Sequence, residues 1–247
     1  KKYNPNKTEL DYRYMQKWIG RTEASLYALL EKQKDIGKLG TSRTILDLKS
    51  CKGEIQTYYD GNRVEARDGF VSVRTNNCLI KGKWCYEVLL ESNGLFQLGF
   101  CQLRTIFNDS NGVGDDIHSY GYDGYRLSCW NKDENRYGKV WDNGDIIGVC
   151  IDIDNHLIEF YQNGEKLGIA KNNLESGPGI AYFPGLSFSN YEKCAFNFGA
   201  YPLIYSYPGY EPIDIPKSQY NGSFEVIHLC PSRTEKLNLA APMILLI

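Results

Sequence analysis

From about residue 45 onward, apolar side chains recur at every second position in short runs, and this alternation constrains the fold more than any other feature. It indicates β-strands, because successive side chains of a strand point to opposite faces of the sheet. Many short runs at close spacing favour an antiparallel sandwich or barrel over alternating strands and helices. We therefore expect a mainly β fold. The clearest runs are 84–89, 96–100 and 147–153.

Two polar pairs, Asp154-Asn155 and Asn163-Gly164, separate apolar runs and predict tight hairpin turns. The 24 Gly and 19 Tyr of the 247 residues agree with a turn-rich β structure. The strands expected around and after the second turn are 157–161, 166–170, 182–188 and 195–198.

The two ends of the chain follow other patterns. Apolar residues near the start recur at helical spacing, so residues 1–44 are predicted to form an N-terminal helical extension packed on its own domain or on a missing neighbour. After Tyr201 the chain is rich in Pro and Tyr, which excludes regular ladder pairing and predicts an extended tail wrapped around the domain. Residues 45–210 would then form the sandwich, and 211–247 a Pro-rich C-terminal extension of a truncated longer protein.

Charge and cysteine usage limit the partners and the compartment. A net charge of -2 provides no broad basic field, so we expect no nucleic-acid partner and no membrane binding. The chain shows no signal peptide and no apolar run of membrane-spanning length. Its eight cysteines form no C-x-x-C pair, and we expect buried free thiols in a reducing compartment. These features predict a cytoplasmic location.

No motif for catalysis or phosphate binding is present, so we expect no catalytic residue and no cofactor. If one Asp-rich loop is aligned with a calcium-binding loop, two of the ligand positions fall on Val113 and Tyr120, which lack suitable oxygens. We therefore expect no metal and interpret the loop as turn-forming, while a small-molecule or metal-binding domain stays open as an alternative. The loop residues are Asp109, Asn111, Gly114 and Asp115.

An aromatic and acidic run follows at 115–125. Tyrosine offers a large contact area and a hydroxyl at small entropic cost, which suits protein recognition. The same tyrosines could instead be half-buried packing residues of a turn. For Tyr122 the sequence leaves both alternatives open.

Six short motifs occur in a fixed order between about Leu46 and Tyr210, and together they resemble the SPRY family. They are GKWCYEV at 82–88, QLGF at 97–100, SYGYDG at 119–124, GDIIG at 144–148, FYQNG at 160–164 and YFPG at 182–185. The resemblance implies a bent antiparallel two-sheet β-sandwich, a concanavalin-like jelly roll, here with an N-terminal helix. It also implies a non-catalytic protein-binding domain, monomeric when isolated.

Within the family, the segments 107–120, 137–141 and 195–199 are most similar to the SPRY domain of KPC-type RING E3 ubiquitin-protein ligases. This resemblance implies a module that recruits a substrate or accessory protein, in a parent that would be a RING-type E3 ubiquitin transferase. Calcium-release channels and helicases share the shorter motifs, so a scaffold domain of another large intracellular protein is an alternative. Another alternative is that the chain is a purely structural part of a larger assembly.

Loops at one edge of such a sandwich can vary without disturbing the core, and recognition collects there. Some SPRY domains hold acidic peptides with Arg and Lys just after the Ser-Tyr pair, where this chain has Asp123 and Tyr125 with Arg126 beyond. That charge favours a neutral or basic partner segment. The predicted peptide site, in part carried over from the family's arrangement, consists of Phe70, Arg74, Gln97, Tyr120, Tyr122 and Asp123.

Overall fold

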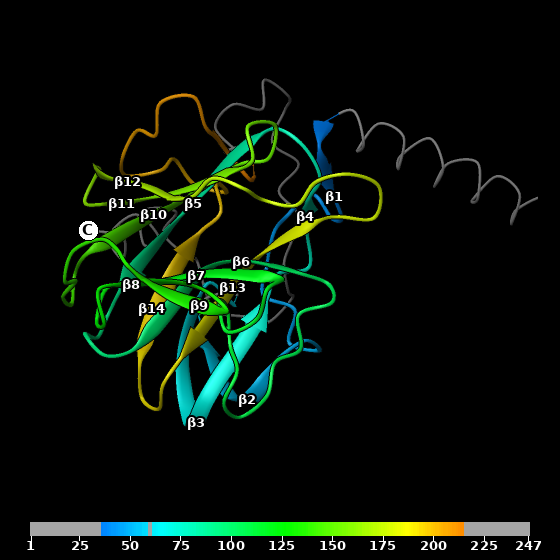
Figure 1. Cartoon of the computed structure of the whole chain (residues 1–247). Helices are drawn as coiled ribbons and strands as arrows, with labels where there is room; N and C mark the ends of the chain where they lie inside the picture. Colours follow the sequence, from blue (N-terminus) through cyan, green and yellow to red (C-terminus); the bar gives the residue numbers. More distant parts are fainter. Residues whose placement is uncertain (1–35, 59–60, 215–247) are drawn as a thin grey trace, which may run out of the picture.

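The computed structural model describes residues 36–58 and 61–214, and in this part of the chain strands dominate (Figure 1). The predicted N-terminal helix lies outside the described residues. No described helix is both long and apolar enough to cross a membrane. The strands are β1 (Lys38–Leu39), β2 (Lys52–Tyr58), β3 (Arg63–Arg74), β4 (Cys78–Leu79), β5 (Lys83–Leu90), β6 (Phe96–Gln102), β7 (Ser119–Asp123), β8 (Ser128–Asn131), β9 (Asp133–Arg136), β10 (Ile146–Asp152), β11 (Leu157–Gln162), β12 (Glu165–Lys171), β13 (Tyr182–Phe188), β14 (Lys193–Asn197) and β15 (Glu211–Pro212).

One antiparallel sheet bends over on itself at the long strand β3. Residues 63–65 of β3 pair with β14, whereas residues 71–74 pair with β13. From β14 the sheet continues through β5, β10, β11 and β12, and from β13 through β6, β7, β8 and β9. Gly69, with a φ of 60°, lies where β3 changes partner. The sheet thus forms two layers, called below the β5 layer and the β6 layer.

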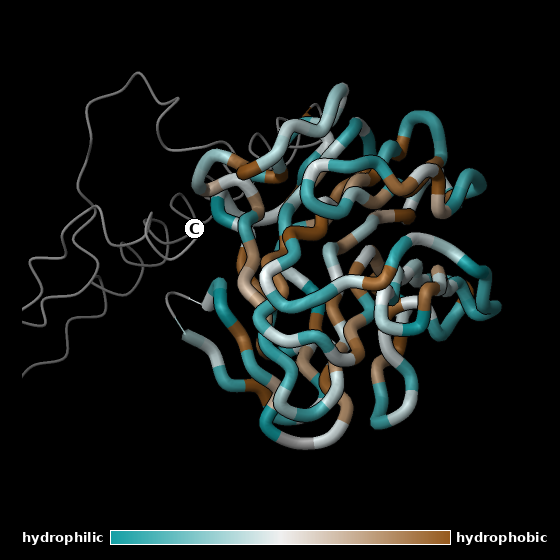
Figure 2. The backbone as a smooth tube through the Cα atoms, turned by 90° about the vertical axis from the view of Figure 1, so that its left-hand side faces the viewer, coloured by the Kyte–Doolittle hydropathy of each residue, from teal (hydrophilic) through white to brown (hydrophobic). Residues whose placement is uncertain are grey.

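The core lies between these two layers, which confirms the predicted β-sandwich. The rings of Tyr122 on β7 and Phe160 on β11 are 5.1 Å apart, although their strands are distant in the sheet order. Tyr86 on β5 packs edge-on against Phe100 on β6 and donates a hydrogen bond of 2.8 Å to the carbonyl of Gly99. Burial of each such side chain contributes about 1.5–3 kcal/mol. Hydrophilic residues gather on the outer turns (Figure 2).

Both predicted hairpin turns are confirmed. Asp154 and Asn155 lie in the turn between β10 and β11, where the Asp152 carboxylate accepts a hydrogen bond of 2.9 Å from the amide of Asn155. Asn163 and Gly164 join β11 to β12 with φ angles of 51° and 79°. Positive φ at both positions is what a two-residue turn with the twist of a hairpin requires, and Asn and Gly tolerate it best.

Other expectations need correction. The segment 119–123, interpreted as part of a loop, is β7, which pairs with β6 on one side and β8 on the other. The Pro-rich tail does form a short ladder, because Glu211 and Pro212 pair in parallel with the start of β5. Proline lacks only the donor, and the neighbouring amide of Ile213 donates to the carbonyl of Cys85 at 3.2 Å.

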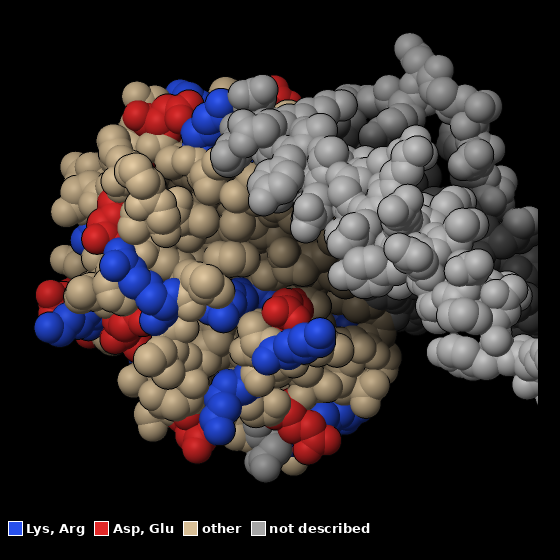
Figure 3. Space-filling view, turned by 90° about the vertical axis from the view of Figure 1, so that its right-hand side faces the viewer, with Lys and Arg blue, Asp and Glu red and all other residues tan. Residues whose placement is uncertain are grey.

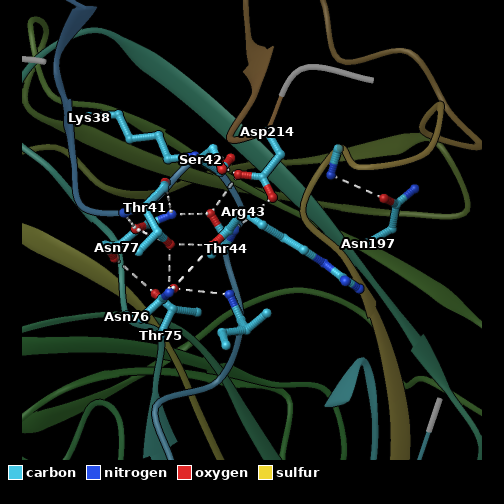
Figure 4. A network of polar contacts seen from close by, with 12 residues as sticks. Lys38, Thr41, Ser42, Arg43, Thr44, Thr75, Asn76, Asn77, Asn197 and Asp214 are labelled. Carbon is cyan, nitrogen blue, oxygen red and sulfur yellow. Dashed lines mark hydrogen bonds and ion pairs between the residues drawn. The ribbon is translucent and has the colours of Figure 1, made fainter. Parts of the chain in front are cut away.

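A buried carboxylate joins the two ends of the described chain (Figure 4). Asp214 accepts hydrogen bonds of 2.7 Å from both the amide and the hydroxyl of Thr44, and Lys38 forms an ion pair with it at 2.5 Å. Asn77 extends the network by donating to the Thr44 hydroxyl at 2.8 Å. Residues 38–44 therefore contact the sandwich through polar groups and the short β1, although the sequence assigned them to the helical extension. We call this network the Asp214 clasp.

Candidate functional site

The six predicted site residues lie on two opposite sides of the β6 layer. Along β7, Tyr120 and Tyr122 point into the core, and Asp123 points to the outer face because side chains alternate. Phe70, Arg74 and Gln97 share the outer face with Asp123, since Leu98 pairs with Tyr122 and Ser187 pairs with both Gln97 and Ser72. The structure thus brings four of the residues to one face and separates two from them.

Tyr122 and Tyr120 are packing residues. The side chain of Tyr122 is fully buried, and its hydroxyl donates to the carbonyl of Lys139 at 2.6 Å. Burial raises the pKa of Tyr122 to about 12, so the hydroxyl remains a donor. Tyr120 is also buried and packs against the ring of Tyr182. In this structure both tyrosines are packing residues, and neither ring lies on the surface where the predicted peptide site would present it.

Asp123 shapes the turn after β7 rather than contacting a partner. Its carboxylate is fully buried, accepts hydrogen bonds from the amides of Tyr125 and Arg126, and is ion-paired with the Arg126 guanidinium. Burial raises the pKa of Asp123, which the ion pair with Arg126 partly offsets. Arg126 also stacks over Trp130 at 4.5 Å. Arg126, the nearest basic side chain after the Ser119-Tyr120 pair, is therefore already engaged within the domain.

Gln97 anchors a loop that covers the outer face. Its amide donates to Asp115 at 3.0 Å, and Asp115 in turn accepts from the amide of Gly112 at 2.7 Å. The loop lies close to the sheet, since a Cβ on Gly121 would come within 2.3 Å of the Val113 carbonyl. Gln97 is buried beneath this loop, so its predicted contact with a partner is corrected as well.

The Asp-rich loop uses its carboxylates internally. Asp115 is engaged as described, and Asp109 forms an exposed ion pair with Lys52 at 3.4 Å. Among the described residues, no group of three or more His, Cys, Asp or Glu is arranged to hold a metal ion. The geometry therefore gives no support to the small-molecule or metal-binding alternative at this loop.

A cluster of exposed aliphatic side chains adjoins Arg74. The Arg74 carbonyl accepts a hydrogen bond of 2.8 Å from the turn that presents Leu48, and its guanidinium donates to the carbonyl of Leu103 at 3.2 Å. The Thr105 hydroxyl donates to the carbonyl of His118 at 3.1 Å, so the backbone segments that carry Ile106 and Ile117 lie side by side. We call this cluster the apolar rim. It consists of Leu48, Leu103, Ile106 and Ile117, with exposed fractions of 53%, 68%, 76% and 56%.

Single exposed aliphatic residues are ordinary, whereas a cluster of them on a loop surface marks a contact site. Beside the rim, Arg74 is half-buried with its guanidinium 5.6 Å from the centre of the Phe183 ring, and Arg104 is ion-paired with Glu175. Phe70 is half-buried on the same strand as Arg74. Lys and Arg lie interspersed with Asp and Glu on the face shown in Figure 3, so no field of one sign develops.

The rim was missed from the sequence because its residues belong to no alternating run. A usable signal was present in the segment 103–106, where a leucine and an isoleucine stand between strands in an otherwise polar loop. Phe70 and Arg74 stay predicted contact residues, since both are partly exposed and Arg74 adjoins the rim. The candidate site is therefore the apolar rim with Arg74 and Phe70.

The middle of the chain is similar in sequence to known proteins. Residues 83–201 match the model of the SPRY domain. The chain is 45% identical over 165 residues to the E3 ubiquitin-protein ligase RKP of Arabidopsis thaliana. It is 31% identical over 156 residues to the probable ATP-dependent RNA helicase ddx1 of Dictyostelium discoideum, and 32% over 126 residues to the ATP-dependent RNA helicase DDX1 of Xenopus laevis. These alignments cover 66%, 63% and 51% of this chain, but only 13%, 20% and 16% of the respective relatives.

Proposed function

Because residues 83–201 match the SPRY domain, we propose that the chain recruits a substrate or accessory protein to an E3 ubiquitin ligase. SPRY is a non-catalytic interaction domain, so the chain itself would bind and not transfer ubiquitin. The observation that carries the proposal is the 45% identity to a protein named as an E3 ubiquitin-protein ligase. Ubiquitin transfer would be carried out by the longer parent protein, of RING type.

The apolar rim supplies the binding surface in this proposal. Binding energy concentrates in a few central residues that are desolvated by the partner, and the exposed Leu and Ile side chains of the rim provide such a centre. Because Arg126 is already paired with Asp123, the partner segment would be neutral or basic rather than acidic. The domain would bind it as a monomer, without nucleic acid or membrane.

Replacing Ile106 with Asp is expected to weaken binding of the partner by about tenfold or more, since a charge would then face the apolar contact. Val140 is 65% exposed on another loop, and Val140→Asp is the matched control. The partner is identified first by capture and mass spectrometry with the wild-type chain, and its affinity is then measured by titration calorimetry. Equal affinities of the two variants, at unchanged melting temperatures, would refute the rim as the binding surface.

The link to ubiquitin is tested in the full-length parent. With E1 and E2 added, Ile106→Asp is expected to reduce ubiquitylation of the identified partner in proportion to its lost affinity, while self-ubiquitylation is unchanged. The two helicase relatives favour a second candidate, a scaffold domain of another large intracellular protein. Rim-dependent binding in a parent that conjugates no ubiquitin would favour that candidate.

We further propose that the domain acts in the cytoplasm. The seven cysteines in the described part of the chain are free, as expected in a reducing compartment. Cys230 lies outside the described residues. We expect all eight thiols to be alkylated when the unfolded protein is treated under non-reducing conditions. Mass spectrometry checks this. A protein that lacks a pair of alkyl groups and is also about 2 Da lighter than its free-thiol form would contain a disulfide and would contradict the expectation.

A further inference from the structure

The Pro- and Tyr-rich tail crosses the outer face of the β5 layer without joining a sheet until β15 (the orange trace in Figure 1). Its contacts converge on one side chain. The Glu87 carboxylate accepts hydrogen bonds of 2.8 Å from the successive amides of Ile204 and Tyr205, and one of 2.9 Å from the Tyr207 hydroxyl. Residues 203–210, called the strap, are held mainly by this buried carboxylate, and the Tyr210 hydroxyl adds a hydrogen bond of 2.9 Å to the Glu159 carboxylate.

A small apolar cluster lies under the strap and is separate from the main core. Cys85 and Cys150 stand opposite each other on β5 and β10 and are buried together with Tyr161 and Tyr207. Tyr207 is the one strap residue that is fully buried, and its ring packs edge-on against Tyr161 at 5.0 Å. Because the main core lies on the other side of the β5 layer, loss of the strap contacts would leave that core packed.

The face beneath the strap is shaped for an aromatic ring. A Cβ on Gly148 would lie 2.1 Å from the Tyr207 ring, so the glycine forms the slot that the ring occupies. Burial and the neighbouring Glu87 carboxylate raise the pKa of Tyr207, which keeps its hydroxyl a donor. The strap also begins beyond residue 201, where the match to the SPRY domain ends.

We propose that the strap opens as a local unit while the sandwich stays folded, and that the uncovered face binds an extended, tyrosine-containing segment of a partner protein. Local opening is a general property of segments with few buried apolar contacts and no ladder of backbone bonds. Once the strap has left, the Glu87 carboxylate and the slot at Gly148 face solvent, and an incoming segment can take over the same acceptor. An incoming segment has to supply two successive backbone amides and a tyrosine hydroxyl, the same set that the strap supplies.

The two thiols beneath the strap report on its opening. In the native protein, a maleimide is expected to label Cys85 and Cys150 about tenfold faster than Cys101 and Cys194, which are fully buried in the sheet layers. Glu87→Gln should accelerate labelling of the first pair and leave the second pair unchanged. Peptide mapping by mass spectrometry separates the sites. Equal labelling rates at all four cysteines would show that the strap opens only with global unfolding, and would overturn the proposal.

Binding to the uncovered face is tested with the strap sequence itself. A fluorescent peptide of residues 201–214 is titrated against the Tyr207→Ala variant, whose slot is vacated. We expect saturable binding at least about tenfold tighter than to the wild-type chain, where the strap competes. A peptide with Ala in place of the slot-filling tyrosine is the matched control, and Gly148→Val should block the slot. Equal binding of both peptides, or no binding to Tyr207→Ala, would overturn the proposal that the face beneath the strap binds a partner segment. The proposed binding at the apolar rim would be unaffected.

Discussion

Replacing Asp123 with Lys is expected to lower the free energy of unfolding by about 3–5 kcal/mol, because the change leaves an uncompensated charge at a fully buried position. The wild-type carboxylate accepts hydrogen bonds from the amides of Tyr125 and Arg126 and pairs with the Arg126 guanidinium. A lysine at this position loses all three interactions and places its ammonium next to another cation. Asp123 thus supports the turn that follows β7.

Urea denaturation of the purified chain measures this effect. Asp133→Lys is the matched control, since Asp133 is exposed on the edge strand β9 and its replacement should change stability by less than about 0.5 kcal/mol. An Asp123→Lys variant as stable as the control would mean that the carboxylate is accessible to solvent. In that case Asp123 would again be a candidate contact residue for the partner.

Removing the Asp214 carboxylate is expected to cost about 3 kcal/mol or more. Asp214→Ala would leave the Thr44 amide and hydroxyl without an acceptor and would leave Lys38, which is largely buried, without its counter-charge. The main core does not depend on the clasp, so we expect the loss to appear first as faster hydrogen exchange at residues 38–44. The total loss in the free energy of unfolding is then measured from the lower denaturant concentration at the midpoint of unfolding.

A double-mutant cycle isolates the clasp interaction. Combined with Thr44→Val, Asp214→Ala should be less destabilising than the sum of the two single changes, with a coupling energy of about 1–3 kcal/mol. Glu211→Ala is the control, because Glu211 is exposed three residues earlier in the same segment. Additive effects of Thr44→Val and Asp214→Ala would contradict a direct stabilising contact between the two side chains.

The strands and hairpin turns could be predicted because their signal is local. The alternation of apolar residues involves positions only a few residues apart, and so does the turn signal of Asn163-Gly164. The structure has strands and a turn at these places. The SYGYDG segment was misread because Gly and Asp normally mark turns. Here Gly121 instead permits the close approach of the Val113 carbonyl, and Asp123 closes the turn that follows the strand. The structural roles of Gly121 and Asp123 depend on tertiary packing, which the spacing of residues along the sequence does not reveal.

The candidate site was only partly predictable for a related reason. Arg74 lies beside the rim, but a sequence does not show that a turn near residue 48 and a loop near residue 103 meet at Arg74. Glu87 is a similar case, since it stands on a strand and meets its donors more than a hundred residues later. Such long-range partners leave no periodic pattern along the chain.

The clasp has a consequence for how this domain can be combined with others. Lys38 and Asp214 touch, so the polypeptide enters and leaves the sandwich at almost the same point. A module with adjacent ends can be accepted within a surface loop of a host protein, because the two sides of the loop are not forced apart. The same proximity makes the sandwich suited to circular permutation, in which a short linker joins the old ends and new ends are opened at an exposed hairpin such as the Asn163-Gly164 turn.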